Sequence, residues 1–132
     1  MHLDLNRARL HHGSWRMQLR RYLEGNEPGD ATVPLSPQDC QFGKWLYTAG
    51  IAKYANLADM DALELVHAQM HDAARRVVEH KKAGRHNEAR EEYRKVAELG
   101  DKVIALLGQV EEKVSQIPVP GEEVLKPWPG LR

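Results

Sequence analysis

Two histidines, His67 and His71, stand four residues apart in a stretch whose apolar spacing predicts a helix. Side chains at this spacing project from the same face of a helix, one turn apart, which suits two ligands of a single metal ion. His67 also shares an apolar stripe with Leu63 and Met70, so its ring nitrogens need polar partners once they are buried. A metal ion is one such partner. A hydrogen-bonded histidine pair, in the core or at the surface, is the alternative.

Two residues elsewhere in the chain have a similar character. His12 is in register with Ala8 on an earlier predicted helix and therefore faces the core, where a histidine is either hydrogen-bonded or metal-bound. Cys40 is expected in the first turn of a short helix, where backbone N–H groups and the helix dipole favour a thiolate; a free cysteine also serves as a small apolar residue. Together with His67 and His71 they make three imidazoles and one thiol. This is the number and kind of ligands in a closed tetrahedral Zn²⁺ site.

Helices must position these residues, because no alternating apolar and polar run is long enough to predict a strand. Apolar residues at three- and four-residue spacing predict four helices, over residues 4–24, 36–50, 59–83 and 87–115. We expect an all-α fold, an antiparallel four-helix bundle in which the second helix is short. That second helix is predicted to have Ser36 as its cap and Pro37 as its first residue.

The C-terminal end of the chain differs from the rest. Four of the seven prolines lie at or beyond residue 118, and no helix persists through so many. We therefore predict a helical bundle over residues 1–117 and a proline-rich C-terminal tail over residues 118–132. Trp128, between two of these prolines, is a candidate docking residue, and a loose chain end is the alternative.

Length and charge exclude several classes of function. A chain of 132 residues has room for one hydrophobic core. Its 19 basic and 19 acidic residues balance, so we expect neither a nucleic acid nor a membrane as a partner. No apolar stretch reaches the roughly 20 residues of a membrane span, and the N-terminus lacks a signal-peptide pattern, so a cytoplasmic location is expected. The single cysteine excludes an intramolecular disulfide.

Three motifs in the sequence resemble a known family. Residues 40–46 read C-x-F-G-K-W-L, His12 precedes Trp15 in an H-x-x-W pattern, and His67 and His71 form H-x-x-x-H. In this order they resemble the chemoreceptor zinc-binding domain, a family found in bacterial chemotaxis receptors and diguanylate cyclases.

The resemblance covers about residues 10–110, and it selects His12 over His11 because only His12 has the three-residue spacing to Trp15. It implies a soluble helical bundle that binds one Zn²⁺ through four ligands, His12, Cys40, His67 and His71. It further implies a sensory or regulatory module, often a homodimer, that signals to a separate output protein in chemotaxis or cyclic-di-GMP pathways.

Cys40 is the one oxidisable residue among these four ligands, and the resemblance implies oxidants such as hypochlorous acid. Oxidation weakens the bond between sulfur and zinc, so we expect oxidation or zinc loss to release the second helix from the first and third. A zinc buffer or a purely structural zinc protein is the alternative. An enzyme is not expected, because four protein ligands leave no position for substrate water and the segment between His67 and His71 lacks the acid of H-E-x-x-H.

Overall fold

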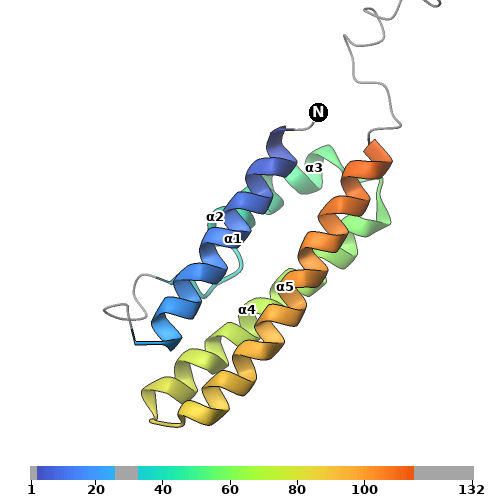
Figure 1. Cartoon of the computed structure of the whole chain (residues 1–132). Coiled ribbons are helices and arrows are strands. Elements are labelled where there is room, and N and C mark those ends of the chain that lie inside the picture. Colours follow the sequence, from blue (N-terminus) through green and yellow to red (C-terminus); the bar gives the residue numbers. More distant parts are fainter. Residues whose placement is uncertain (1–2, 26–32, 115–132) are drawn as a thin grey trace, which may run out of the picture.

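Helices make up most of the chain that the computed structural model describes, which is residues 3–25 and 33–114. In chain order the elements are α1 (Leu3–Leu23), α2 (Gln41–Trp45), a π-helical turn (Leu46–Gly50), α3 (Ile51–Lys53), α4 (Ala58–Lys82) and α5 (His86–Val114) (Figure 1). These ranges contain no strand, so the predicted all-α class is confirmed.

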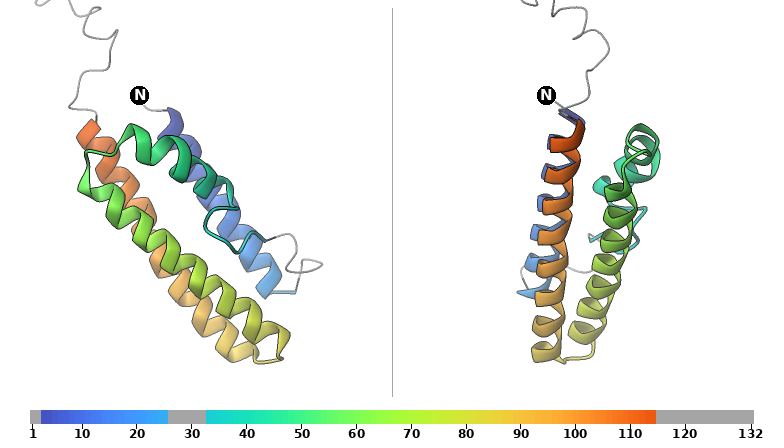
Figure 2. Two further views of the ribbon diagram at one scale, coloured as in Figure 1. Left: turned by 180° about the vertical axis from the view of Figure 1, so that it is seen from behind. Right: turned by 90° about the vertical axis from the view of Figure 1, so that its right-hand side faces the viewer.

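The helices form two layers. Helices α4 and α5 are an antiparallel pair in contact along their whole length, and α1 lies beside α5 (Figure 2). The α2–α3 segment packs on α1 and shares a layer with α4. The arrangement is the predicted four-helix bundle, with its second position occupied by several consecutive helical pieces where one short helix was predicted.

The three long helices begin and end within one residue of their predicted bounds wherever those bounds are described. Glycines that adopt left-handed backbone conformations follow two of them: Gly25 after α1, with φ +82°, and Gly84 after α4, with φ +79°. A side chain is strained in this conformation, which is why glycine is the common residue just beyond a helix end. The predicted last residue of the fourth helix, Ser115, lies outside the described residues.

Apolar side chains from every long helix meet between the layers. Those with less than 2% of their surface exposed include Leu5, Leu19, Leu46, Leu63, Met70, Val77, Val96 and Leu107. Burial of each such side chain contributes about 1.5–3 kcal/mol to the free energy of folding. His12, His67 and His71 occupy this same interior, so the apolar core surrounds a polar centre.

The predicted start of the second helix was wrong. Ser36 does not cap a helix; its hydroxyl donates to the side chain of Gln38, and the Asp39 N–H donates to the Ser36 carbonyl at 3.0 Å in a single turn. Cys40 follows in an extended conformation, with φ −78° and ψ 156°, and is itself the N-cap of a helix that begins at Gln41. The extended backbone at Cys40 separates the turn from the helix, and this places the sulfur at the helix entrance.

The predicted end of the second helix, near Gly50, was also wrong, because the chain stays helical through the π-helical turn and α3 to Lys53. Gly50 has a packing role there. A Cβ atom at this position would lie 3.1 Å from the ring of Trp45, so the glycine lets the indole pack against the backbone. The Tyr54 hydroxyl then donates to the Asp4 carboxylate at 3.0 Å, which fixes the end of α3 to the beginning of α1.

Some of the sequence predictions concern residues that the structure does not describe. The boundary at residue 117, the tail over residues 118–132 with Trp128, and residues 26–32 of the first connection are outside the described ranges. Within residues 3–25 and 33–114, every helix is too short or too polar to span a membrane.

Candidate metal centre

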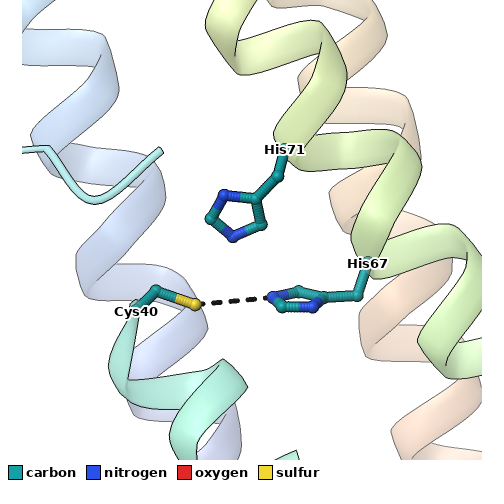
Figure 3. A group of neighbouring side chains, drawn as sticks. All are labelled: Cys40, His67 and His71. Carbon is teal, nitrogen blue, oxygen red and sulfur yellow. Dashed lines mark hydrogen bonds between the residues drawn. The ribbon is translucent and has the colours of Figure 1, made fainter. Parts of the chain in front are cut away.

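Three of the four predicted ligands converge in the interior of the bundle (Figure 3). His67 and His71 project from one face of α4 toward Cys40 at the entrance of α2. The ligand atoms of the three residues all lie within 4.8 Å of one another. Both histidines are 0% exposed and the cysteine is 2% exposed, so the group is shielded from bulk water.

The spacing of these atoms fits a zinc ion. The Cys40 Sγ lies 3.4 Å from Nε2 of His67. In a tetrahedral zinc site, bonds of about 2.3 Å to sulfur and about 2.0 Å to nitrogen place those two atoms about 3.5 Å apart. One sulfur and two imidazole nitrogens are also the donor types that structural zinc sites use. The residues therefore fit the ion in distance and in chemistry.

A main-chain carbonyl orients the ring of His71. Nδ1 of His71 lies 2.9 Å from the carbonyl oxygen of Leu35, and a carbonyl can only accept, so Nδ1 carries the proton. This assigns the lone pair to Nε2, which is buried and has no hydrogen-bond partner among the described residues. Metal-binding histidines commonly donate their second ring nitrogen in this way, because the hydrogen bond fixes both tautomer and orientation.

His12 is buried at 2% exposure, as the sequence predicted, but it lies outside the group of three. Neither of its ring nitrogens has a hydrogen-bond partner among the described residues. The ring packs against α5 at Gly100, where a Cβ atom would lie 3.1 Å from Cε1 and Nε2 of His12. The role of His12 as a fourth ligand therefore stays a prediction, and the two orphaned nitrogens are consistent with it.

The electrostatic surroundings of Cys40 differ from the sequence expectation. Burial raises the pKa of the Cys40 thiol above its usual value, and the nearby Asp39 carboxylate acts in the same direction. The backbone N–H groups of Gly43 and Phe42 lower the pKa, and the Gly43 N–H lies 3.1 Å from Sγ, but their effect is smaller than that of burial. The helix entrance alone therefore does not hold a thiolate. A bound cation would supply the missing positive charge.

Aromatic rings enclose the group. The Trp15 ring packs on His71 with centroids 4.6 Å apart, and the Phe42 ring packs on His67 at 4.8 Å. The Trp15 indole also donates to the Pro34 carbonyl at 2.7 Å, so it joins α1 to the segment that leads to Cys40. These rings keep water from the ligand atoms and lower the local dielectric constant.

Three contributors to the centre were not predicted from the sequence. The Leu35 carbonyl leaves no trace in a sequence pattern, and Gly100 makes room for His12 only because α1 and α5 lie side by side. Gly43 is part of the C-x-F-G-K-W-L motif, but the reason for a glycine there lies in the turn before the helix. A Cβ atom at this position would collide with the Pro37 carbonyl oxygen.

Comparison with protein families agrees with this geometry. The model of the chemoreceptor zinc-binding domain matches residues 12–78, half of the chain. The chain belongs to the chemoreceptor zinc-binding domain family. The match contains all four predicted ligands, and zinc is the cofactor that the family and the Cys40, His67 and His71 group support. No curated protein and no solved structure matches the chain in the corresponding comparisons.

We predict one zinc ion per chain in protein purified without chelator, as measured by native mass spectrometry. Alanine at Cys40, His67 or His71 removes a ligand, so we expect zinc affinity to fall by more than about 100-fold. Loss of a residue that only hydrogen-bonds to a metal ligand costs up to about 100-fold. His12→Ala and His11→Ala form a matched pair. A loss of affinity in the first but not the second would establish His12 as the fourth ligand, whereas equal affinities would exclude it.

We predict that the zinc-free protein loses stability in acid. Burial lowers the pKa of His67 to about 3 and those of His12 and His71 to about 4, from the usual 6.5. Below pH 6.5 the unfolded chain therefore binds more protons than the folded chain, and the free energy of unfolding falls by up to about 1.4 kcal/mol per pH unit for each histidine until about pH 4. Urea unfolding between pH 4 and 8 measures this loss. A free energy of unfolding that stays constant between pH 4 and 8 would contradict this prediction. The control variant is His86→Ala, which replaces an exposed histidine instead of a buried one.

Proposed function

We propose that the chain is a zinc-dependent sensory or regulatory module in which Cys40 is the responsive ligand. It reports zinc availability, or oxidants such as hypochlorous acid, to a separate output protein in bacterial chemotaxis or cyclic-di-GMP signalling. The observation that carries the proposal is the unequal anchoring of the ligands. His67 and His71 belong to α4, a helix of 25 residues packed along α5, whereas Cys40 stands at the entrance of a five-residue helix.

Within the described residues, three hydrogen bonds join main-chain carbonyls of the segment over residues 33–40 to the long helices. The Pro34 carbonyl accepts from Trp15, and the Leu35 carbonyl accepts from His71 and Arg75, so one of the three depends on a ligand residue. Val33 is also buried in the hydrophobic core. When bound, zinc supplies a cation that keeps Cys40 as thiolate and ties it to α4. Oxidation of the sulfur removes this tie, because a sulfenic acid is a poorer ligand than a thiolate. The segment and α2 then separate from α4, and an output protein reads the change.

Hydrogen–deuterium exchange tests this proposal. After one equivalent of hypochlorous acid, we expect zinc release, and faster exchange over residues 33–50 than over α4 and α5. The tertiary contacts of α4 and α5 are far more extensive, so these helices keep their slow exchange. Cys40→Ala protein serves as the control and shows no further change on oxidation. Zinc retention with unchanged exchange over residues 33–50 would contradict the proposal.

A zinc buffer or a structural zinc protein uses the same ligands and is the second candidate. It differs in kinetics and in response. A buffer exchanges zinc rapidly with a competing chelator, and a structural protein unfolds globally when zinc is removed. A sensor of the proposed kind loses zinc slowly until Cys40 is oxidised, and then changes locally. Zinc transfer rates to a chromogenic chelator, before and after oxidation, separate the three.

We propose a second copy of this chain as the partner on the outer face of α1 and α5. Leu10 and Met17 on α1 are 72% and 53% exposed, and Ile104 on α5 is 36% exposed. Nothing lies within 4 Å of a Cβ placed at Gly13 or Gly108, so the two helices offer open positions beside these apolar side chains. Large exposed apolar side chains next to open glycines favour close contact with another helix.

Charge favours one orientation for the two copies. Helix α1 carries five arginines and one aspartate, whereas α5 carries seven acidic and five basic residues. A two-fold axis parallel to the helices places α1 of one copy on α5 of the other, which brings opposite net charges together. A two-fold axis that lies in the plane of the contact and is perpendicular to the helices places α1 on α1 and α5 on α5, so that helices with net charge of the same sign meet. The first arrangement is therefore the favoured one.

We predict that Leu10→Glu with Met17→Glu converts a dimer into a monomer with its zinc content unchanged. Leu65→Glu is the matched control, because Leu65 is 60% exposed on α4 in the other layer. Native mass spectrometry gives oligomeric state and zinc content together. A wild-type monomer at micromolar concentration, or a dimer that survives the double substitution, would exclude this face as the contact between copies.

A further inference from the structure

Trp15 contacts two parts of the metal centre with one side chain. Its ring packs on the ring of His71, with the centroids 4.6 Å apart, and its indole N–H donates to the Pro34 carbonyl at 2.7 Å. Only 3% of its surface is exposed. This buried indole of α1 therefore meets both a metal ligand on α4 and the segment that leads to Cys40.

The Pro34 and Leu35 carbonyls are consecutive in the chain, and they accept from different helices. Trp15 on α1 donates to the first, and Nδ1 of His71 on α4 lies 2.9 Å from the second. Arg75 is a further donor to the Leu35 carbonyl. Its Nη1 lies at 3.4 Å, beyond the usual range of an N–H···O bond, and its side chain is 44% exposed. The two shorter hydrogen bonds to these carbonyls thus come from the indole and the imidazole.

Apolar contacts place this segment, but they do not set the direction of its carbonyls. Val33 is 3% exposed, and Leu35 packs against the core. Burial of apolar surface is non-directional, so the peptide planes between these side chains could still rotate. A hydrogen bond depends on angle. Because the peptide unit is planar, a donor on the Pro34 carbonyl fixes that whole plane, and only two backbone dihedral angles separate it from the Leu35 carbonyl.

The direction of the Leu35 carbonyl decides which nitrogen of His71 can bind zinc. A neutral imidazole carries its proton on either Nδ1 or Nε2. The carbonyl stabilises the proton on Nδ1, which leaves the lone pair on Nε2, a buried atom without a hydrogen-bond partner among the described residues. If the carbonyl turned away, the two tautomers would compete. A ring with its proton on Nε2 could not offer that nitrogen to an ion.

We propose that Trp15 is a positioning residue of the metal centre. By holding the Pro34 carbonyl, its indole N–H directs the Leu35 carbonyl at Nδ1 of His71 and so keeps Nε2 available to zinc. The indole nitrogen is a donor only, so Trp15 supplies no ligand atom and acts through the backbone. The inference rests on the zinc ligands and not on the proposed sensory role of Cys40.

Trp15→Phe tests this role, because phenylalanine keeps an aromatic ring beside His71 but has no N–H. In the zinc-free full chain with isotope-labelled histidine, NMR of the ring nitrogens reports the tautomer. We expect wild-type His71 to carry its proton on Nδ1, and most of the His71 rings in the variant to carry it on Nε2. Apparent affinity is proportional to the competent fraction, so a competent fraction of about one fifth lowers zinc affinity about fivefold in a chelator competition.

Trp45→Phe is the matched control. The Trp45 ring is partly buried and packs on Phe42 with centroids 5.7 Å apart, but its indole nitrogen has no hydrogen-bond partner among the described residues. The substitution therefore removes an indole without removing a hydrogen bond, and we expect the wild-type tautomer of His71. Arg75→Ala removes the more distant donor to the Leu35 carbonyl, and we expect it to lower zinc affinity by less than about twofold.

Three results would overturn the proposal. They are a wild-type His71 with its proton on Nε2, a tautomer that Trp15→Phe leaves unchanged, and a tautomer that depends on Arg75 and not on Trp15. Circular dichroism shows whether each variant is folded. Should Trp15→Phe not fold without zinc, the readout is the exchange of the His71 Nδ1–H with water in zinc-loaded protein. Exchange at least about tenfold faster than in wild type supports the proposal, and equal exchange overturns it.

The sensory proposal fails separately. Zinc retained after oxidation of Cys40 would overturn that proposal alone, because neither the tautomer of His71 nor the exchange of its Nδ1–H is measured through the sulfur.

Discussion

Four histidine ring nitrogens lie buried in this bundle without a hydrogen-bond partner among the described residues. A buried polar atom left in this state costs about 1–3 kcal/mol, so the group as a whole would consume much of the stability of a small domain. A zinc ion bound by Cys40, His67 and His71 would satisfy Nε2 of His71, and His12 as fourth ligand would bring one of its two nitrogens to the ion as well. Bound zinc would therefore remove part of this cost. The apolar core holds the helices in register, and a bound ion would in turn bond to the ligand atoms that the helices bring into the interior.

The ligands differ in how firmly the fold holds them. Two stand one turn apart on α4, which packs along α5, and their relative position follows from helix geometry alone. The third, Cys40, comes from a backbone that leaves a turn, extends for one residue and then enters a short helix. The group of three thus joins a long helix to a short one. Any chemistry that changes the sulfur acts on the short helix.

Sequence patterns predicted those features that local physics controls. The long helices follow from a 3.6-residue apolar period and from glycines at their ends, and the pairing of His67 with His71 follows from helical spacing. The cap of the second helix depended on a competition that the sequence does not reveal. Ser36 and Pro37 carry the usual signature of a helix start, yet their turn is separate, and Cys40 takes the capping position because its sulfur accepts from the Gly43 N–H. The contact of His12 with Gly100 requires knowledge of how α1 and α5 lie together.

His71 receives its orientation from the carbonyl of Leu35, which is a main-chain atom. Every amino acid supplies that carbonyl, so no single substitution at position 35 deletes the acceptor. The hydrogen bond to the histidine therefore does not depend on the side chain at position 35, which has a separate role in packing against the core. Insertions and deletions in the connection before it are a different matter, because they displace the backbone itself. The orientation of His71 is thus insensitive to the identity of residue 35 and sensitive to the length of the connection that precedes it.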